Sequence, residues 1–147
     1  MHTVPTSSPP TWARMLGFAG LLPFVAGAVL LWAVRDPSTA AHAAVAYAAT
    51  IAAFLGGVHW GPALRAGGLA PVPLLWGMVP QLAGWLALLM PASASLATCA
   101  AVLVACYAAD RRLYPEAGLG AWLPMRLQLT IISATSCLLG AAAAHVG

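Results

Sequence analysis

Five apolar stretches, each about twenty residues long and each closed by charged residues, glycine or proline, constrain this chain more than any other feature. A helix rises about 1.5 Å per residue, so about twenty residues cross the roughly 30 Å hydrocarbon core of a bilayer. The chain is 62% hydrophobic and only 6% charged, which is more apolar surface than a soluble domain of 147 residues can bury. The sequence therefore predicts an all-α fold: a polytopic membrane helical bundle with five transmembrane helices.

The expected organisation is a disordered N-terminal tail over residues 1–11, which is polar and rich in proline, followed by one transmembrane domain over residues 12–147. The predicted spans are about 15–34, 41–62, 71–90, 93–109 and 123–145. A secretory signal is the competing interpretation of the first span, because Ala41-His42-Ala43 resembles a cleavage site. We favour a retained helix, since a twenty-residue apolar run is too long for the core of such a signal.

The arginines predict the orientation in the membrane. If the N-terminus is cytoplasmic, five arginines lie on that side and only Arg35 lies opposite; the five are Arg14, Arg65, Arg111, Arg112 and Arg126. Basic residues concentrate on the cytoplasmic side of membrane proteins. We therefore predict a bacterial inner (cytoplasmic) membrane protein whose C-terminus lies on the opposite side. The arginines form no dense run, so the sequence gives no indication of nucleic-acid binding.

Small residues at helical spacing predict which helix faces pack together, because transmembrane helices associate through close backbone approach. Three predicted seams are Ala49, Ala53, Gly57 and Gly61; Gly77, Gln81, Gly84 and Leu88; and Arg126, Thr130, Ser133, Cys137, Gly140 and Ala144. Pro23 and Pro80 lie within spans and are expected to kink their helices.

The candidate functional residues are ionisable groups inside or near the spans, because such groups cost free energy to bury. His59 lies about one turn from the predicted cytoplasmic end of its span, and Asp110 and Arg126 fall at the same depth, with Trp60 nearby. This cluster suits a carbonyl-bearing or anionic head group, such as that of a quinone or a lipid. In the structural alternative, Asp110 and Arg126 form an ion pair between helices and His59 bonds a neighbouring carbonyl.

Other polar residues carry weaker predictions. Gln81 lies deep in the third span, where it either bonds a neighbouring helix or lines a cavity. Cys99, Cys106 and Cys137 fall in apolar runs without metal-ligand spacing, so they are expected to be small core residues. No catalytic residue, metal site or cofactor is predicted.

Several short elements together resemble a known family. They are FLGGVHWG at 54–61, Met78-Val79-Pro80, Gly84-Trp85-Leu86, Asp110, and Met125-Arg126-Leu127 with Thr130. Across about residues 12–145 the chain resembles domain-of-unknown-function family 3429, the transmembrane protein 69-like proteins. The resemblance implies a small protein with several membrane spans and assigns no activity. The family's matched polar positions coincide with His59, Asp110 and Arg126.

Two functional hypotheses follow. The leading one is a non-enzymatic accessory or assembly component of a membrane complex, because the predicted loops are too short to hold a soluble active site. Its partners would be the lipid bilayer and another membrane protein or a second copy of the chain. The alternative is a protein that binds a quinone or lipid, or an enzyme acting on one, through His59, Trp60, Asp110 and Arg126.

Overall fold

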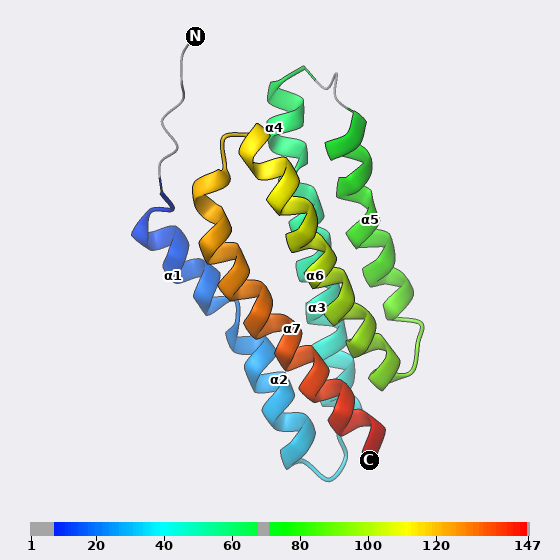
Figure 1. The fold of residues 1–147 in the computed structure, drawn as a ribbon. Coiled ribbons are helices and arrows are strands. Elements are labelled where there is room, and N and C mark those ends of the chain that lie inside the picture. The colour runs from blue at the N-terminus through cyan, green and yellow to red at the C-terminus, as the bar shows by residue number, and fades with distance from the viewer. Residues whose placement is uncertain (1–7, 68–70, 147) are drawn as a thin grey trace.

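The computed structural model describes residues 8–67 and 71–146, and every regular element within them is a helix. The elements are α1 (Thr11–Ala19), α2 (Leu22–Ala33), α3 (Ser38–Val58), α4 (Trp60–Arg65), α5 (Pro71–Ala87), α6 (Ala92–Glu116), the short 3₁₀ helix η1 (Gly120–Trp122) and α7 (Leu123–Val146). They run up and down the molecule in five passes (Figure 1). The predicted all-α membrane bundle is confirmed, whereas most of the predicted tail, residues 1–7, lies outside the described residues.

Four of the five passes are long and apolar enough to cross a bilayer: Thr11–Ala33, Ser38–Arg65, Ala92–Glu116 and Gly120–Val146. The remaining pass, α5, has 17 residues, which is at the short end of the range for a transmembrane helix. The helix α6 continues beyond the span predicted for it, through Asp110 to Glu116. This extension carries Asp110 inside a helix instead of at its end.

Two passes are interrupted, and proline explains both interruptions. A proline has no N–H, and its ring clashes with the carbonyl of the residue four positions earlier. That residue is Ala19 for Pro23 and Val58 for Pro62, and α1 and α3 end at these residues. The first break leaves the Gly20 carbonyl free, and the Tyr47 hydroxyl donates a hydrogen bond to it at 2.8 Å. By contrast, α5 continues through Pro80 without interruption.

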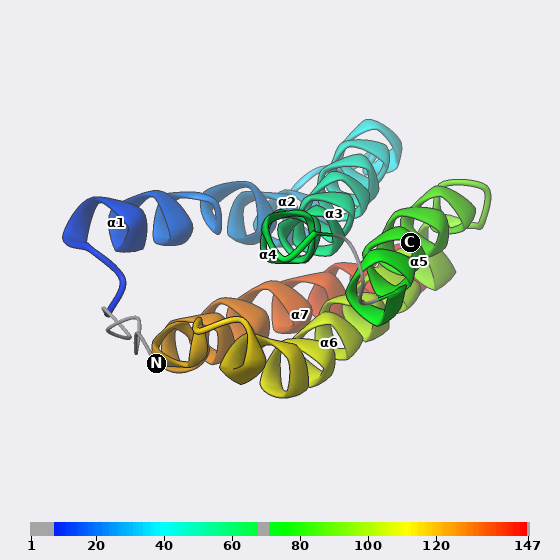
Figure 2. The same ribbon diagram turned by 90° about the horizontal axis from the view of Figure 1, so that it is seen from above.

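Seen from above, α1, α2 and α3 form one row and α6 and α7 form a second, while α5 closes the side away from α1 (Figure 2). The core lies between the rows. It is built from small and aliphatic side chains, including Ala48, Ala52, Leu96, Cys99, Leu103 and Cys106. The three cysteines are free and buried, as expected of core residues.

The predicted seam on α7 is correct for five of its six residues, because Ala144 is half-buried whereas the other five are buried: Arg126, Thr130, Ser133, Cys137 and Gly140. The seam predicted on α3 is wrong in its second half, because Gly57 and Gly61 are exposed. A helix turns 100° per residue, so a strict spacing of four drifts by about 40° at each step. The α7 seam alternates spacings of four and three, and it therefore stays on one face.

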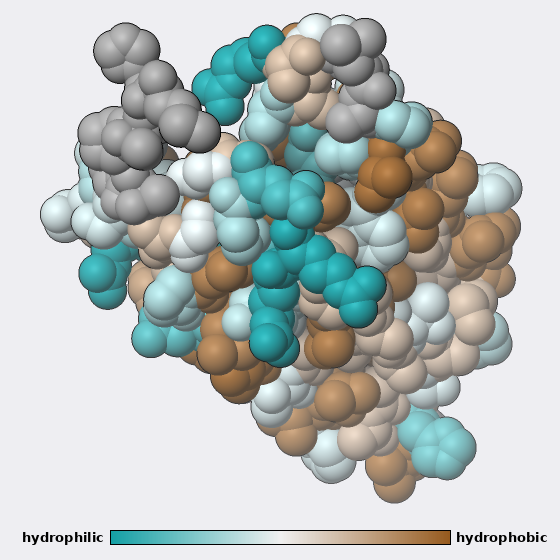
Figure 3. All heavy atoms as spheres, turned by 45° about the horizontal axis from the view of Figure 1, so that its top comes forward, coloured by the Kyte–Doolittle hydropathy of each residue, from teal (hydrophilic) through white to brown (hydrophobic). Residues whose placement is uncertain are grey.

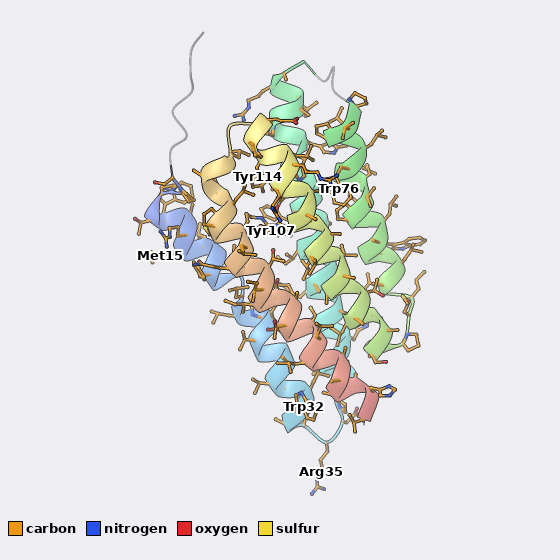
Figure 4. The ribbon with its side chains drawn as sticks, viewed as in Figure 1. Met15, Trp32, Arg35, Trp76, Tyr107 and Tyr114 are labelled. Atoms are coloured by element: carbon orange, nitrogen blue, oxygen red, sulfur yellow. The ribbon has the colours of Figure 1, made fainter. Side chains whose placement is uncertain are left out.

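The loop ends of the bundle differ in charge. Figure 4 places Arg35 beyond the end of α2, at the end opposite to Tyr114. Near Arg35, hydrogen bonds from the side chain and backbone N–H of Ser38 hold the pKa of the Asp36 carboxyl below its usual value. Hydrophilic side chains gather at the other end, while the flanks below it are mostly hydrophobic (Figure 3). This hydrophilic end carries Arg65 of α4 and, from the last turns of α6, Arg111 and Arg112.

Candidate functional site

A buried ionic cluster joins three passes of the bundle. The Asp110 carboxylate on α6 accepts a hydrogen bond from Arg126 Nε at 2.7 Å, through Oδ2. Its other oxygen, Oδ1, lies 3.0 Å from Nε2 of His59. All three residues are buried: Asp110 is 1% exposed, Arg126 7% and His59 5%. The structure thus brings together the three ionisable residues that the sequence singled out.

Asp110 is the centre of the cluster because it uses both carboxylate oxygens. The sequence left open whether His59 belongs to a cluster with Asp110 and Arg126 or bonds a neighbouring carbonyl instead. Here Asp110 holds both partners, with one carboxylate oxygen within hydrogen-bond distance of each. The Tyr114 ring lies 5.6 Å from the His59 ring, one helical turn beyond Asp110.

Local backbone features position these side chains. His59 is the single residue between α3 and α4, and its N–H donates to the Gly56 carbonyl at 3.2 Å. After α6, Gly118 adopts a left-handed conformation with φ of 73°. The N–H groups of Gly118 and Leu119 then bond the Pro115 and Tyr114 carbonyls. This glycine-ended cap stops α6 and turns the chain toward α7, where Arg126 lies in the first turn.

Two other predicted residues lie outside the cluster. Trp60 turns toward α5, where its Nε1 donates a hydrogen bond to the Leu74 carbonyl at 3.2 Å. Gln81 is exposed on the outer side of α5 and is not among the described residues that line the cavity beside the cluster. The face of α5 that packs inward carries Gly77, Pro80, Gly84 and Ala87 instead. Trp60 therefore links α4 to α5 by a hydrogen bond. The prediction that Gln81 faces the interior of the bundle is wrong.

A cavity of about 500 Å³ lies beside the ionic cluster, between α1 and the second row of helices. This volume is in the range of small-molecule sites. Its walls are almost wholly apolar and come from α1, α2, α3, α6 and α7; they include Leu16, Phe24, Phe54, Leu103, Trp122 and Leu129. Among the residues that the structure describes, Arg126 is the only charged one in the lining, which also contains Tyr114 and Thr130. The cavity is therefore an apolar space with one polar end.

Arg126 has an unused donor at this polar end. Its Nη2 is buried and has no hydrogen-bond partner among the described residues. The other such atom in that part of the chain is Nε1 of Trp76, on α5 and outside the cavity lining. A buried donor without a partner is costly, and a guanidinium nitrogen more so, because it carries charge. Within the described part of the chain, this nitrogen is the one buried side-chain polar atom of the cavity-lining residues that has no partner.

Sequence reasoning missed the cavity and the part of Tyr114 and Thr130 in its wall. A usable signal was present, since Tyr114 follows Asp110 by four residues and Thr130 follows Arg126 by four. Residues four apart share a helix face. The contribution of Trp12, Leu16 and Gly17 on α1 could not be found in this way, because it depends on how α1 is placed by the break at Gly20.

Together, the apolar passes and the helical bundle define an integral membrane protein with several spans. The chain belongs to the family described as protein of unknown function (DUF3429), whose model matches residues 9–142. It is also similar to transmembrane protein 69 of Xenopus tropicalis, with 44% identity over 85 residues. That match covers 54% of this chain and 33% of the length of the relative. No solved structure matches this chain.

Proposed function

We propose that this protein binds an apolar-tailed molecule that enters from the bilayer, with an acceptor oxygen of its head group bonded to Arg126. The carrying observation is the buried, unpartnered Nη2 of Arg126 in the wall of an otherwise apolar cavity. Quinones and lipids have the required combination of tail and acceptor. The three-residue cluster supports this role by holding the guanidinium in place through Asp110.

The helix α1 provides the wall through which such a ligand would enter. None of its residues is buried, although Trp12, Leu16 and Gly17 line the cavity. Figure 2 shows α1 at the edge of the molecule, across from the start of α7. A wall helix with little burial opens at low free energy. Lateral entry between α1 and α7 is therefore the route that we propose.

Blocking the cavity tests this function. Ala13 lines the cavity, so Ala13→Phe should fill part of it, whereas Met15→Phe changes an α1 residue that is 68% exposed and lies outside the lining. Both variants and the wild type would be purified in a mild detergent, and all bound small molecules would be identified by mass spectrometry. We expect a ligand on the wild type and on Met15→Phe, and at least a severalfold loss on Ala13→Phe. An empty wild type, or equal retention by Ala13→Phe, would contradict the proposal.

A second candidate function is that of a component of a larger membrane complex, and exposed Gln81 favours it. An amide that faces hydrocarbon loses its hydrogen bonds to water, and a hydrogen-bonding side chain on another transmembrane helix restores them. We propose that the occupant of this face is a helix of another membrane subunit with an amide or hydroxyl at the same depth. The exposed neighbours Met78, Leu82 and Trp85 would pack against that helix.

Gln81→Leu tests this second function. Gln128 is also exposed, but it lies within the first two turns of α7, close to the hydrophilic end, so Gln128→Leu is the control. We expect Gln81→Leu to reduce the size of the complex extracted from native membranes in mild detergent, as measured by native electrophoresis. Gln128→Leu should leave it unchanged. If wild type and Gln81→Leu migrate alike, this candidate function is lost and the ligand site is unaffected.

We also propose that the protein lies in a bacterial inner membrane with its hydrophilic end in the cytoplasm. The support is the exposed arginines at that end, Arg14, Arg65, Arg111 and Arg112, against Arg35 at the other. Alkaline phosphatase fused after α7 should then be active, and a green fluorescent protein fused there should stay dark when exported by the general secretory route. The reverse pattern would show that the orientation is inverted.

A further inference from the structure

We propose that the head group bound at Arg126 is uncharged and presents a carbonyl oxygen, as quinones and lipid esters do. This inference rests on the proposed ligand-binding function and adds the charge class of the ligand to it. The reason is that the Arg126 guanidinium already has a counter-charge, the Asp110 carboxylate, before any ligand enters the cavity.

The ion pair of Asp110 and Arg126 has one negative and one positive group. The Asp110 carboxylate accepts the hydrogen bond from Arg126 Nε at 2.7 Å and lies 3.0 Å from His59 Nε2. A neutral imidazole already supplies one N–H donor for Asp110, so the contact needs no proton on the second ring nitrogen. Asp110 therefore balances the positive charge of the guanidinium.

No other charged side chain faces the cavity in the described part of the chain. Among the described residues the lining contains one charged residue, Arg126, and its other polar side-chain groups are hydroxyls and indole N–H groups, those of Tyr114, Thr130, Ser133, Trp12 and Trp122. Exposed Arg14, Arg111 and Arg112 belong to the same end of the molecule but not to the lining. They are solvated, and an anionic head group is better placed beside them at the membrane surface than inside the cavity.

An anionic head group in the cavity would add a second negative charge to a guanidinium that Asp110 already balances. Taking an anion out of water costs several kcal/mol in proteins unless a free opposite charge receives it. A carbonyl carries no net charge, yet it accepts the same hydrogen bond from Nη2. The unused nitrogen therefore selects an acceptor by hydrogen bonding and rejects an anion by desolvation.

Three probes with tails of equal length test this inference. They are methyl laurate, laurate and a benzoquinone with the same alkyl chain, added to the full-length protein in a non-ionic detergent near neutral pH. Native mass spectrometry would count the molecules bound at each concentration. We expect at least one of the two carbonyl probes to bind at least about tenfold more tightly than laurate. The order of methyl laurate and the quinone would distinguish a lipid ester from a quinone as the source.

The outcomes separate the inference from the function on which it rests. If laurate binds as tightly as both carbonyl probes, or more tightly, the neutral head group is wrong and the ligand site stands. If none of the three binds to the wild type, the ligand site and this inference both fall. These comparisons use the wild type and do not depend on a variant that folds.

The Asp110→Asn variant gives a second, independent test of the preference for an uncharged head group. The change keeps the shape of the side chain but removes the negative charge that balances Arg126. In folded protein of this variant, the preference should shift toward laurate by at least about tenfold, because the guanidinium is then free to pair with an anion. An unchanged preference in folded Asp110→Asn would overturn the inference.

Discussion

Asp110→Ala is expected to destabilise the bundle by about 3–5 kcal/mol, because it leaves the Arg126 guanidinium buried without its counter-charge. Asp110 is 1% exposed, and its carboxylate lies within hydrogen-bond distance of both Arg126 and His59. Titration with sodium dodecyl sulfate in mixed micelles measures the loss. Glu116→Ala is the matched control, since it removes an exposed carboxylate from the last turn of the same helix. Equal losses in the two variants would show that the buried pair adds nothing to stability.

A double variant separates the structural part of Asp110 from its part in binding. Asp110→Leu with Arg126→Met replaces the buried ion pair by apolar side chains, and such replacements are often neutral or stabilising. We expect most of the lost stability to return, while the ligand donor at Arg126 is gone. A stable double variant that still holds the ligand would show that the cluster is structural only.

Gly56→Ala is expected to destabilise the bundle by about 1–3 kcal/mol or more, although alanine is the better helix former. A Cβ added at Gly56 would overlap the Gly77 carbonyl on α5, and backbone cannot move aside as a flexible side chain can. The adjacent Gly57 is the control, because a Cβ there meets nothing within 4 Å. Gly57→Ala should be neutral or stabilising by roughly 0.5–1 kcal/mol, the helix-propensity gain.

The same unfolding titration measures both glycine variants. Gly77→Ala gives a further check from the other helix, because its Cβ would overlap the indole of Trp60 and lie 2.9 Å from the Gly56 carbonyl. If Gly56→Ala and Gly57→Ala have equal stability, the backbones of α3 and α5 do not approach as closely as they do in this structure.

The FLGGVHWG element at 54–61 can now be read in terms of contacts. Gly56 allows the backbone of α5 to approach, His59 reaches Asp110, and Trp60 bonds a carbonyl of α5. Pro62, just after the element, ends α3 and so places His59 at the break. Gly57 and Gly61 have no such contacts, and their part in the element has no account in the structure.

Much of the fold was predictable from the sequence because membrane crossing imposes a length and an apolar composition on every pass. The depth of His59, Asp110 and Arg126 followed from the same counting, which is why the cluster was expected. The direction in which Gln81 and Trp60 face was not predictable. That direction depends on the rotation of a helix about its axis, and small residues on more than one face of α3 and α5 left the rotation open.

The cavity was not predictable for a different reason. It exists because α1 and α2 are joined through a short break, and the position of α1 relative to α2 depends on tertiary contacts such as the Tyr47 bond to Gly20. The break itself could be derived from Pro23, but the space that it opens beside Arg126 requires coordinates.

The exposure of α1 should be visible in hydrogen–deuterium exchange. Because none of its residues is buried, its backbone amides should exchange hydrogen for deuterium sooner than those of α6 or α7. A molecule held between α1 and α7 would give this helix the packing that it otherwise lacks. Occupancy of the cavity would then be recorded as slower deuterium uptake across Thr11–Ala19, in a signal that requires neither a labelled ligand nor an assay of activity.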